Sequence, residues 1–154
     1  MTNYQLIIYN YVIGGTDVSV KVISPEVEVV TFLKEIKEIL TDPKFDVLRD
    51  LDILPKKKNE DPIDPYTTFN TMISLGFDSY DVYTQLLALD ITEYMETFID
   101  DKDNDLPPFF AFGKIIKNRE ICIKVKIRDR KSRKIFCVSF HFARYPLSGK
   151  RPYA

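Results

Sequence analysis

From Leu106 onward the sequence alternates apolar and polar residues with a period of two, and this pattern constrains the fold most strongly. Alternation of this kind is typical of strands that are buried on one side only. Three segments share it, FFAFGKII, EICIKVKIR and KIFCVSFHFA, joined by KNR and RDRKSRK. Such short connections leave no room for a crossover helix, so we expect three consecutive strands of an antiparallel sheet.

The second and third of these strands each have an apolar side and a polar side. We expect the apolar side to pack against helices: Ile121, Ile123, Val125, Ile127, Phe136, Val138, Phe140 and Phe142. We expect the other side to be open, and it carries Cys122, Lys124, Lys126, Arg128, Ile135, Cys137, Ser139 and His141.

The chain before these strands predicts a hairpin and several helices. Strands QLIIYNYVI and VSVKVIS flank the turn Gly14–Asp17. Ser24 and Pro25 begin a helix that Asp42 and Pro43 end. Further helices are expected from Asp64–Pro65 to Gly76, from Asp78 or Ser79 to Leu89, and from Thr92 through Phe98.

The segment between the first two of these helices is the least regular. Phe45, Val47, Leu51 and Ile53 suggest a strand. Lys56–Lys58, followed by acidic residues and prolines, indicates an exposed loop, although a lysine triplet can also contact nucleic acid.

These elements predict an α+β fold in one domain, residues 1–154. Helices pack on one face of a twisted C-terminal antiparallel sheet. Residues 1–62 form an N-terminal extension of hairpin, helix and loop, and residues 63–154 form the helix–sheet core. No apolar run reaches the ~20 residues of a membrane span, and no signal peptide is recognised, so we expect a cytoplasmic protein with two free thiols, Cys122 and Cys137.

Charge is distributed unevenly along the chain. Residues 1–105 hold 9 Lys and Arg against 21 Asp and Glu, whereas residues 106–154 hold 13 against two. The two parts carry net charges of −12 and +11. The basic part is either a face that binds a polyanion, or a surface that the acidic part packs beside and neutralises.

The only histidine, His141, lies at the end of the basic run. A hairpin turning symmetrically about Lys131 and Ser132 predicts four cross-strand pairs: Arg128–Ile135, Lys126–Cys137, Lys124–Ser139 and Cys122–His141. His141 can be a half-buried, hydrogen-bonded side chain, or it can belong to a Cys122–His141 dyad. A metal or other cofactor is not expected, because no second His and no nearby carboxylate supplies further ligands.

The remaining chemistry is metal-free cleavage of a phosphodiester. RNA carries its own nucleophile, the 2′-hydroxyl, so a protein has only to orient it, move protons and stabilise charge on the phosphorane. His141 is suited to proton transfer, and cations can hold the scissile phosphate: Lys114, Lys124, Lys126 and Arg128. Arg130, Arg144 and Ser139 complete the expected RNA-binding set.

The segments LGFDSYDVYTQLLALDITEYMETF, FAFGKIIKNREICIKVKI and VSFHFARYPLSGKRPY resemble MqsR-type (motility quorum-sensing regulator) toxins of bacterial toxin–antitoxin pairs. The resemblance covers about residues 66–153. It implies a RelE-like fold whose open sheet face cuts messenger RNA without a metal, leaving 2′,3′-cyclic phosphate ends, on or off the ribosome. It also implies a cognate antitoxin that neutralises the protein.

The resemblance also implies roles for single residues. Lys124 matches a strand lysine of the family, and His141 falls at a position where members have a lysine or histidine. Cys122 stands where a tyrosine is common, and Glu96 or Met95 replaces an expected helix lysine. Tyr145 is a substitute phenol.

Three functions therefore stay open. The first is the endoribonuclease toxin that arrests growth. The second is a non-catalytic module or regulator that binds an acidic protein or nucleic acid through the basic sheet face. The third is a structural subunit whose acidic region docks on the basic sheet of a second copy, giving a homodimer.

Overall fold

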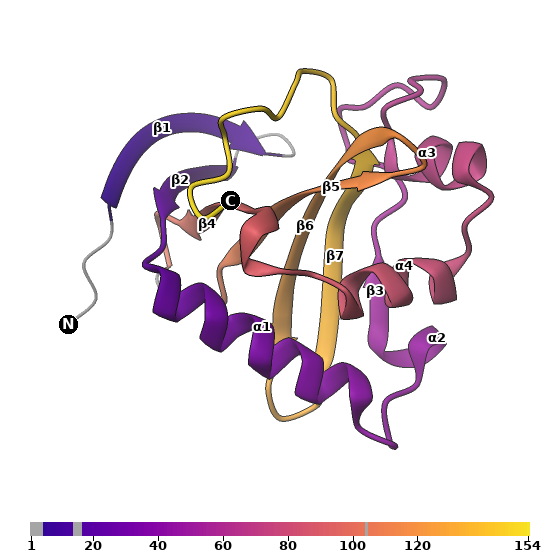
Figure 1. Cartoon of the computed structure of the whole chain (residues 1–154), viewed down its shortest axis with the longest axis horizontal. Coiled ribbons are helices and arrows are strands. Elements are labelled where there is room, and N and C mark those ends of the chain that lie inside the picture. Colours follow the sequence, from indigo (N-terminus) through magenta and orange to yellow (C-terminus); the bar gives the residue numbers. More distant parts are fainter. Residues whose placement is uncertain (1–4, 14–16, 104) are drawn as a thin grey trace.

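The computed structural model describes residues 5–13, 17–103 and 105–154, and the strands within these ranges form one seven-stranded sheet (Figure 1). The sheet order is β1 (Gln5–Ile13), β2 (Asp17–Ile23), β4 (Tyr94–Asp100), β5 (Phe109–Ile116), β6 (Arg119–Asp129), β7 (Lys134–Phe142) and β3 (Leu51–Ile53). Neighbours are antiparallel except β3, which pairs parallel to β7. The predicted α+β class and the three consecutive C-terminal strands are confirmed. The turn predicted at residues 14–17 lies mostly outside the described residues.

The N-terminal region contributes to both edges of this sheet. β1 and β2 extend it beyond β4, and β3 extends it beyond β7. The helices are α1 (Glu26–Thr41), α2 (Val47–Asp50), α3 (Thr68–Leu75), α4 (Ser79–Leu87) and the 3-10 turn η1 (Ile91–Glu93). Among the described residues, no helix has the length and apolar character needed to cross a membrane.

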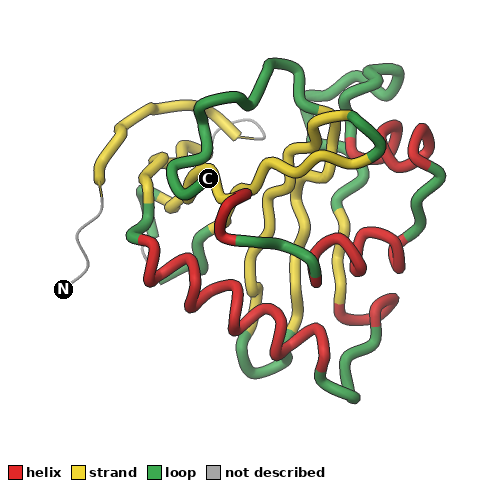
Figure 2. Tube along the Cα trace, in the orientation of Figure 1, coloured by secondary structure: helices red, strands yellow, loops and turns green. Residues whose placement is uncertain are grey.

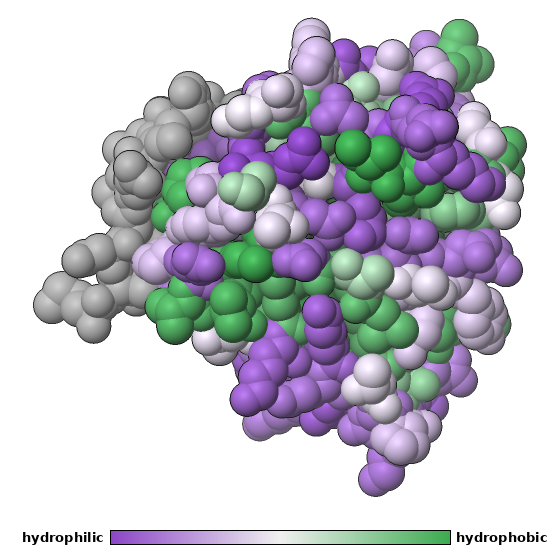
Figure 3. Space-filling model, in the orientation of Figure 1, coloured by the Kyte–Doolittle hydropathy of each residue, from purple (hydrophilic) through white to green (hydrophobic). Residues whose placement is uncertain are grey.

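Helix α1 covers one face of the sheet, and the main core lies between them (Figure 2). Phe32 of α1 stacks on Phe110 of β5 with ring centroids 4.0 Å apart. The predicted apolar side of β6 is buried there, with Ile121 and Val125 both 0% exposed. Figure 3 shows this side of the molecule, where hydrophobic side chains lie over the first half of α1. Val27 and Val30 are exposed in that half.

Helix α3 protects the part of the β7 edge that β3 does not reach. The backbone N–H groups of Phe140 and Phe142 donate to the hydroxyl oxygens of Thr68 and Thr71 at 3.0 and 3.1 Å. These bonds satisfy strand donors that would otherwise be an open edge. They also hold the C-terminal half of β7, which carries His141, in a fixed position.

Two predicted helix starts are wrong. Thr67, not Asp64, caps α3, because the Thr67 hydroxyl accepts from the Asn70 N–H at 3.1 Å. Ser24 does not cap α1, since its hydroxyl is buried against that of Thr97 at 2.7 Å. The predicted stop at Gly76 is confirmed, with φ at 70°, and so is the start at Asp78, which forms a capping box.

The helix predicted from Thr92 is also wrong. Residues 94–100 form strand β4, preceded only by η1. Tyr94 and Phe98 have helical spacing, but Tyr94 pairs with Phe112 and Phe98 pairs with Phe109 across the sheet. Pairing with β2 on one side and β5 on the other overrides the local pattern.

The predicted alternation in β7 fails at a β-bulge. Lys124 pairs with Ser139 but Val125 pairs with Cys137, so Val138 is an extra residue in β7. The faces of the first half of the strand are therefore reversed. Ile135 and Cys137 are buried in the core at 0% exposure, and Phe136 instead lies on the side of Lys126, its cross-strand partner.

Candidate functional site

The polar face of the sheet contains a cavity of about 400 Å³. Strands β4 to β7 form its floor, and the loop after β3 forms one wall. Its principal polar and reactive lining groups are Lys57, Glu60, Glu96, Cys122, Lys124, Ser139 and His141. The face predicted to be open is thus partly covered, and Lys124 is only 8% exposed.

The strand register brings four predicted residues together in this cavity. Cys122 lies opposite His141 and Lys124 opposite Ser139, as the hairpin pattern predicts. Diagonal neighbours on one sheet face are about 7–8 Å apart, which long side chains span. His141 and Lys124 can therefore act on one bound group between them.

The loop after β3 adds a cation, Lys57, from the lysine triplet for which the sequence left an exposed loop and a nucleic-acid contact open. Lys57 Nζ donates to Ser139 Oγ at 2.7 Å. Its backbone N–H donates to Glu60 Oε1 at 2.8 Å, and Lys56 Nζ donates to the carbonyls of Lys57 and Glu60 at 2.9 and 2.6 Å. Lys56 and Glu60 thus fold the loop so that Lys57 points into the cavity. The lysine triplet is a poor signal for this arrangement, because only the tertiary contact distinguishes Lys57 from its neighbours.

Burial shifts the protonation of Lys124. Its pKa falls from 10.5 to about 7, first because burial removes water from the ammonium group and second because Lys57 carries a like charge nearby. Glu96 opposes the shift. Nζ lies 3.4 Å from the ring centroid of Phe98. Lys124 therefore exists as both ammonium and free amine near neutral pH.

The ring of His141 is held in one tautomer. Nδ1 lies 3.0 Å from the carbonyl oxygen of Phe142. A carbonyl only accepts, so Nδ1 carries the hydrogen and Nε2 is the basic atom of the neutral ring. Burial lowers the pKa of His141 below its usual 6.5, although the carbonyl contact opposes this. His141 is consequently a neutral base at pH 7.

The two thiols are held in their protonated forms. Burial raises the pKa of Cys122, and that of Cys137 to about 12. Cys137 lies in the core, where its Sγ is 3.3 Å from the Ser139 carbonyl oxygen. A thiol nucleophile needs a lowered pKa, so the raised pKa of Cys122 argues against a Cys122–His141 dyad, although the two residues lie opposite each other.

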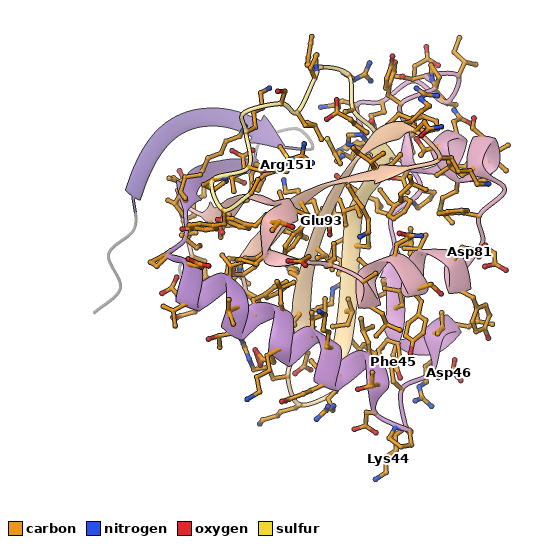
Figure 4. The ribbon with its side chains drawn as sticks, in the orientation of Figure 1. Lys44, Phe45, Asp46, Asp81, Glu93 and Arg151 are labelled. Atoms are coloured by element: carbon orange, nitrogen blue, oxygen red, sulfur yellow. The ribbon has the colours of Figure 1, made fainter. Side chains whose placement is uncertain are left out.

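Two other predicted catalytic residues lie away from the cavity. Lys114 is on the helix-covered face, where its Nζ contacts both carboxylate oxygens of Glu93 at 3.0 Å and the Ala88 carbonyl at 3.1 Å. Glu93 is labelled in Figure 4, on the same side of the sheet as α1. Tyr145 is 72% exposed beyond the end of β7 and does not line the cavity.

The predicted RNA-binding arginines are paired with acidic residues from the first part of the chain. Arg128 contacts Asp52 at 2.7 Å, Arg130 contacts Glu35 at 2.8 Å, and Arg144 contacts Asp64. Of the seven ion pairs among the described residues, five join an acid from residues 1–105 to a base from residues 106–154. Much of the charge asymmetry is therefore neutralised within the molecule. The cavity itself holds Lys57 and Lys124 together with Glu60 and Glu96, and Lys126 lies on the same face of β6 as Lys124.

Glu96, which stands where the family resemblance implies a helix lysine, is instead a strand residue of β4 that lines the cavity. Its carboxylate contacts Lys21 at 3.3 Å.

Within the described residues, no three His, Cys, Asp or Glu side chains are grouped so that they could hold a metal ion. No family model, curated protein or solved structure matches the chain.

Proposed function

We propose that this protein is an endoribonuclease toxin of a toxin–antitoxin pair, with a RelE-like fold, that cleaves messenger RNA in the cytoplasm without a metal. The observation that carries the proposal is the meeting of His141, Lys124 and Lys57 in one cavity. Their pKa values are all lowered by burial, so nitrogen bases and nitrogen acids coexist there near pH 7. Acid–base catalysis is most effective when the catalytic pKa values lie near the working pH.

The proposed reaction is an in-line transesterification. Neutral Nε2 of His141 takes the proton of the 2′-hydroxyl, and the 2′-oxygen forms a bond to phosphorus. The bond from phosphorus to the 5′-oxygen breaks, and the ammonium of Lys124 gives that oxygen its proton. The products are a 2′,3′-cyclic phosphate and a free 5′-hydroxyl.

Lys57 would offset the charge that develops on the phosphorane. Its ammonium is fixed by Ser139 rather than solvated by bulk water. Prearranged donors in a partly buried site stabilise developing charge more than solvated groups do. A bound phosphate also favours the protonated form of Lys124, because it adds negative charge close to the ammonium group.

Induced expression tests this proposal in cells. The wild-type protein is expected to arrest growth and to leave transcripts with new 5′-hydroxyl ends. His141→Gln and Lys124→Met are each expected to abolish both effects, and the control Lys44→Met, at an exposed lysine beyond α1 (Figure 4), is expected to retain them. Arrest that survives both cavity substitutions in folded protein would contradict the assignment.

A second function is favoured by the pairing of Arg128, Arg130 and Arg144. Phosphate contacts dominate the affinity of most nucleic-acid binders, and these three arginines are already engaged. A cavity of about 400 Å³ suits a small anionic ligand as well as a nucleotide. A non-catalytic module would bind RNA or a phosphorylated compound through the cavity but produce no new RNA ends.

A further inference from the structure

A second hollow adjoins the cavity on the same face of the sheet. It has a volume of about 560 Å³ and contains two aromatic rings, Phe109 of β5 and Phe136 of β7. Lysines 56, 57, 58 and 126 line it, together with one acid, Asp100. We call it the aromatic groove.

The aromatic groove exists because of the bulge at Val138. Without the extra residue, Phe136 would share the core face with Phe140. The bulge turns it toward the polar face, where its ring centroid lies 5.8 Å from that of Phe109 at an interplanar angle of 62°. Bulges frequently re-aim side chains beside functional sites. A phenylalanine among lysines can bind a ligand that has both an aromatic and an anionic part, because the ring contacts the first and the ammonium groups contact the second.

Cations already contact both rings. Lys126 Nζ lies 4.6 Å from the Phe109 centroid, and the Arg128 guanidinium lies 4.1 Å from the Phe136 centroid. Burial and the charge of Arg128 lower the pKa of Lys126. An anion bound beside Lys126 would therefore stabilise its ammonium form.

The aromatic groove and the catalytic cavity are neighbours that share one lining residue. Lys57 lines both of them. Lys124 of the cavity and Lys126 of the groove are two residues apart on one face of β6, which corresponds to about 6.6 Å along a strand. That distance is comparable to the spacing of successive phosphates in a single nucleic-acid strand.

We infer that the aromatic groove is a subsite for the nucleotide next to the cleaved bond: its base stacks on Phe136 with the Phe109 ring at its edge, and Lys126 contacts its phosphate. The inference rests on the proposed ribonuclease function and specifies its substrate as single-stranded RNA. Bases in a duplex are already stacked and cannot occupy such a groove, whereas unpaired bases commonly stack on aromatic side chains.

The test uses a short single-stranded 2′-fluoro RNA, which lacks the 2′-hydroxyl nucleophile, with binding measured by fluorescence anisotropy. Phe136→Leu keeps an apolar side chain but removes the ring, and is expected to weaken binding about tenfold. Phe136→Trp is expected to bind at least as tightly as wild type. The control Tyr80→Leu removes an exposed ring on α4 and is expected to change nothing.

A scan of single abasic nucleotides along the same RNA locates the subsite. At one position, loss of the base is expected to weaken wild-type binding and to leave Phe136→Leu unaffected. Unchanged affinity of Phe136→Leu, or weaker binding by folded Phe136→Trp, would overturn the inference. If wild type cleaves natural RNA and Phe136→Leu binds normally, only the subsite is wrong. If wild type neither binds nor cleaves RNA, both the subsite and the proposed ribonuclease function are wrong.

Discussion

Replacing Lys124 with methionine should stabilise the protein while removing its activity. Lys124 has a pKa of about 7 in the folded protein against 10.5 for an ordinary lysine. At 1.36 kcal/mol per pKa unit, this difference sets an upper limit of about 5 kcal/mol on the cost of burying the ammonium at low pH. We therefore expect Lys124→Met to gain up to about 5 kcal/mol at pH 7, with each kcal/mol raising Tm by about 2–4 °C.

The pH dependence of this gain identifies its cause. Because the folded-state pKa is lowered, the unfolded chain binds more protons than the folded one between about pH 7 and 10.5. Wild-type stability must rise through that window, and the advantage of Lys124→Met must shrink and vanish above it. Urea denaturation at pH 7, 9 and about 11 measures this, with Lys44→Met as the control at an exposed site. A destabilised Lys124→Met at pH 7, or a gain independent of pH, would refute the reasoning.

The remaining predictions concern the cavity and one turn. The value of kcat/KM for RNA cleavage should depend on pH in two ways. With increasing pH it should rise below pH 6.5, where His141 loses its proton, and fall above about pH 7, where Lys124 loses its proton. Lys57→Met should move the falling limb to higher pH, because the charge of Lys57 lowers the pKa of Lys124; an unmoved limb would exclude Lys124 as the acid. Gly76→Ala should destabilise the fold by about 1–2 kcal/mol, because Gly76 has φ at 70°, a left-handed conformation that alanine adopts only at a cost. Thermal denaturation measures this, and an unchanged Tm would contradict the prediction.

The register that builds the cavity could be predicted from the sequence. The symmetric hairpin places Cys122 opposite His141 and Lys124 opposite Ser139, and both pairs are present because an extra residue in β6, Arg128, offsets the extra residue in β7, Val138. The predicted pairs nearer the turn are wrong: Lys126 pairs with Phe136, and Ile127 takes the place of Arg128 opposite Ile135. Alternation in a half-buried strand allows few registers, because a slip of one residue would expose the core. The same reasoning failed for Phe136, because nothing in the local pattern marks the extra residue at Val138.

The parts of the site that come from distant segments could not be predicted. Lys57 reaches Ser139 across 82 residues, and Glu93 holds Lys114 on the opposite face. Whether a lysine lies in a cavity or in an ion pair depends on which acid the fold places beside it. Charge counts along the chain predicted that acidic and basic parts can neutralise each other, but not which residues do so.

In the proposed mechanism, His141 transfers a proton during metal-free RNA cleavage. The most direct measurement incubates purified wild type and His141→Gln with a long messenger RNA in excess EDTA, with and without ribosomes, and identifies the ends of the fragments. We expect 2′,3′-cyclic phosphate and 5′-hydroxyl ends from the wild type alone. Intact RNA with the wild type under both conditions, or equal cleavage by a folded His141→Gln variant, would contradict it.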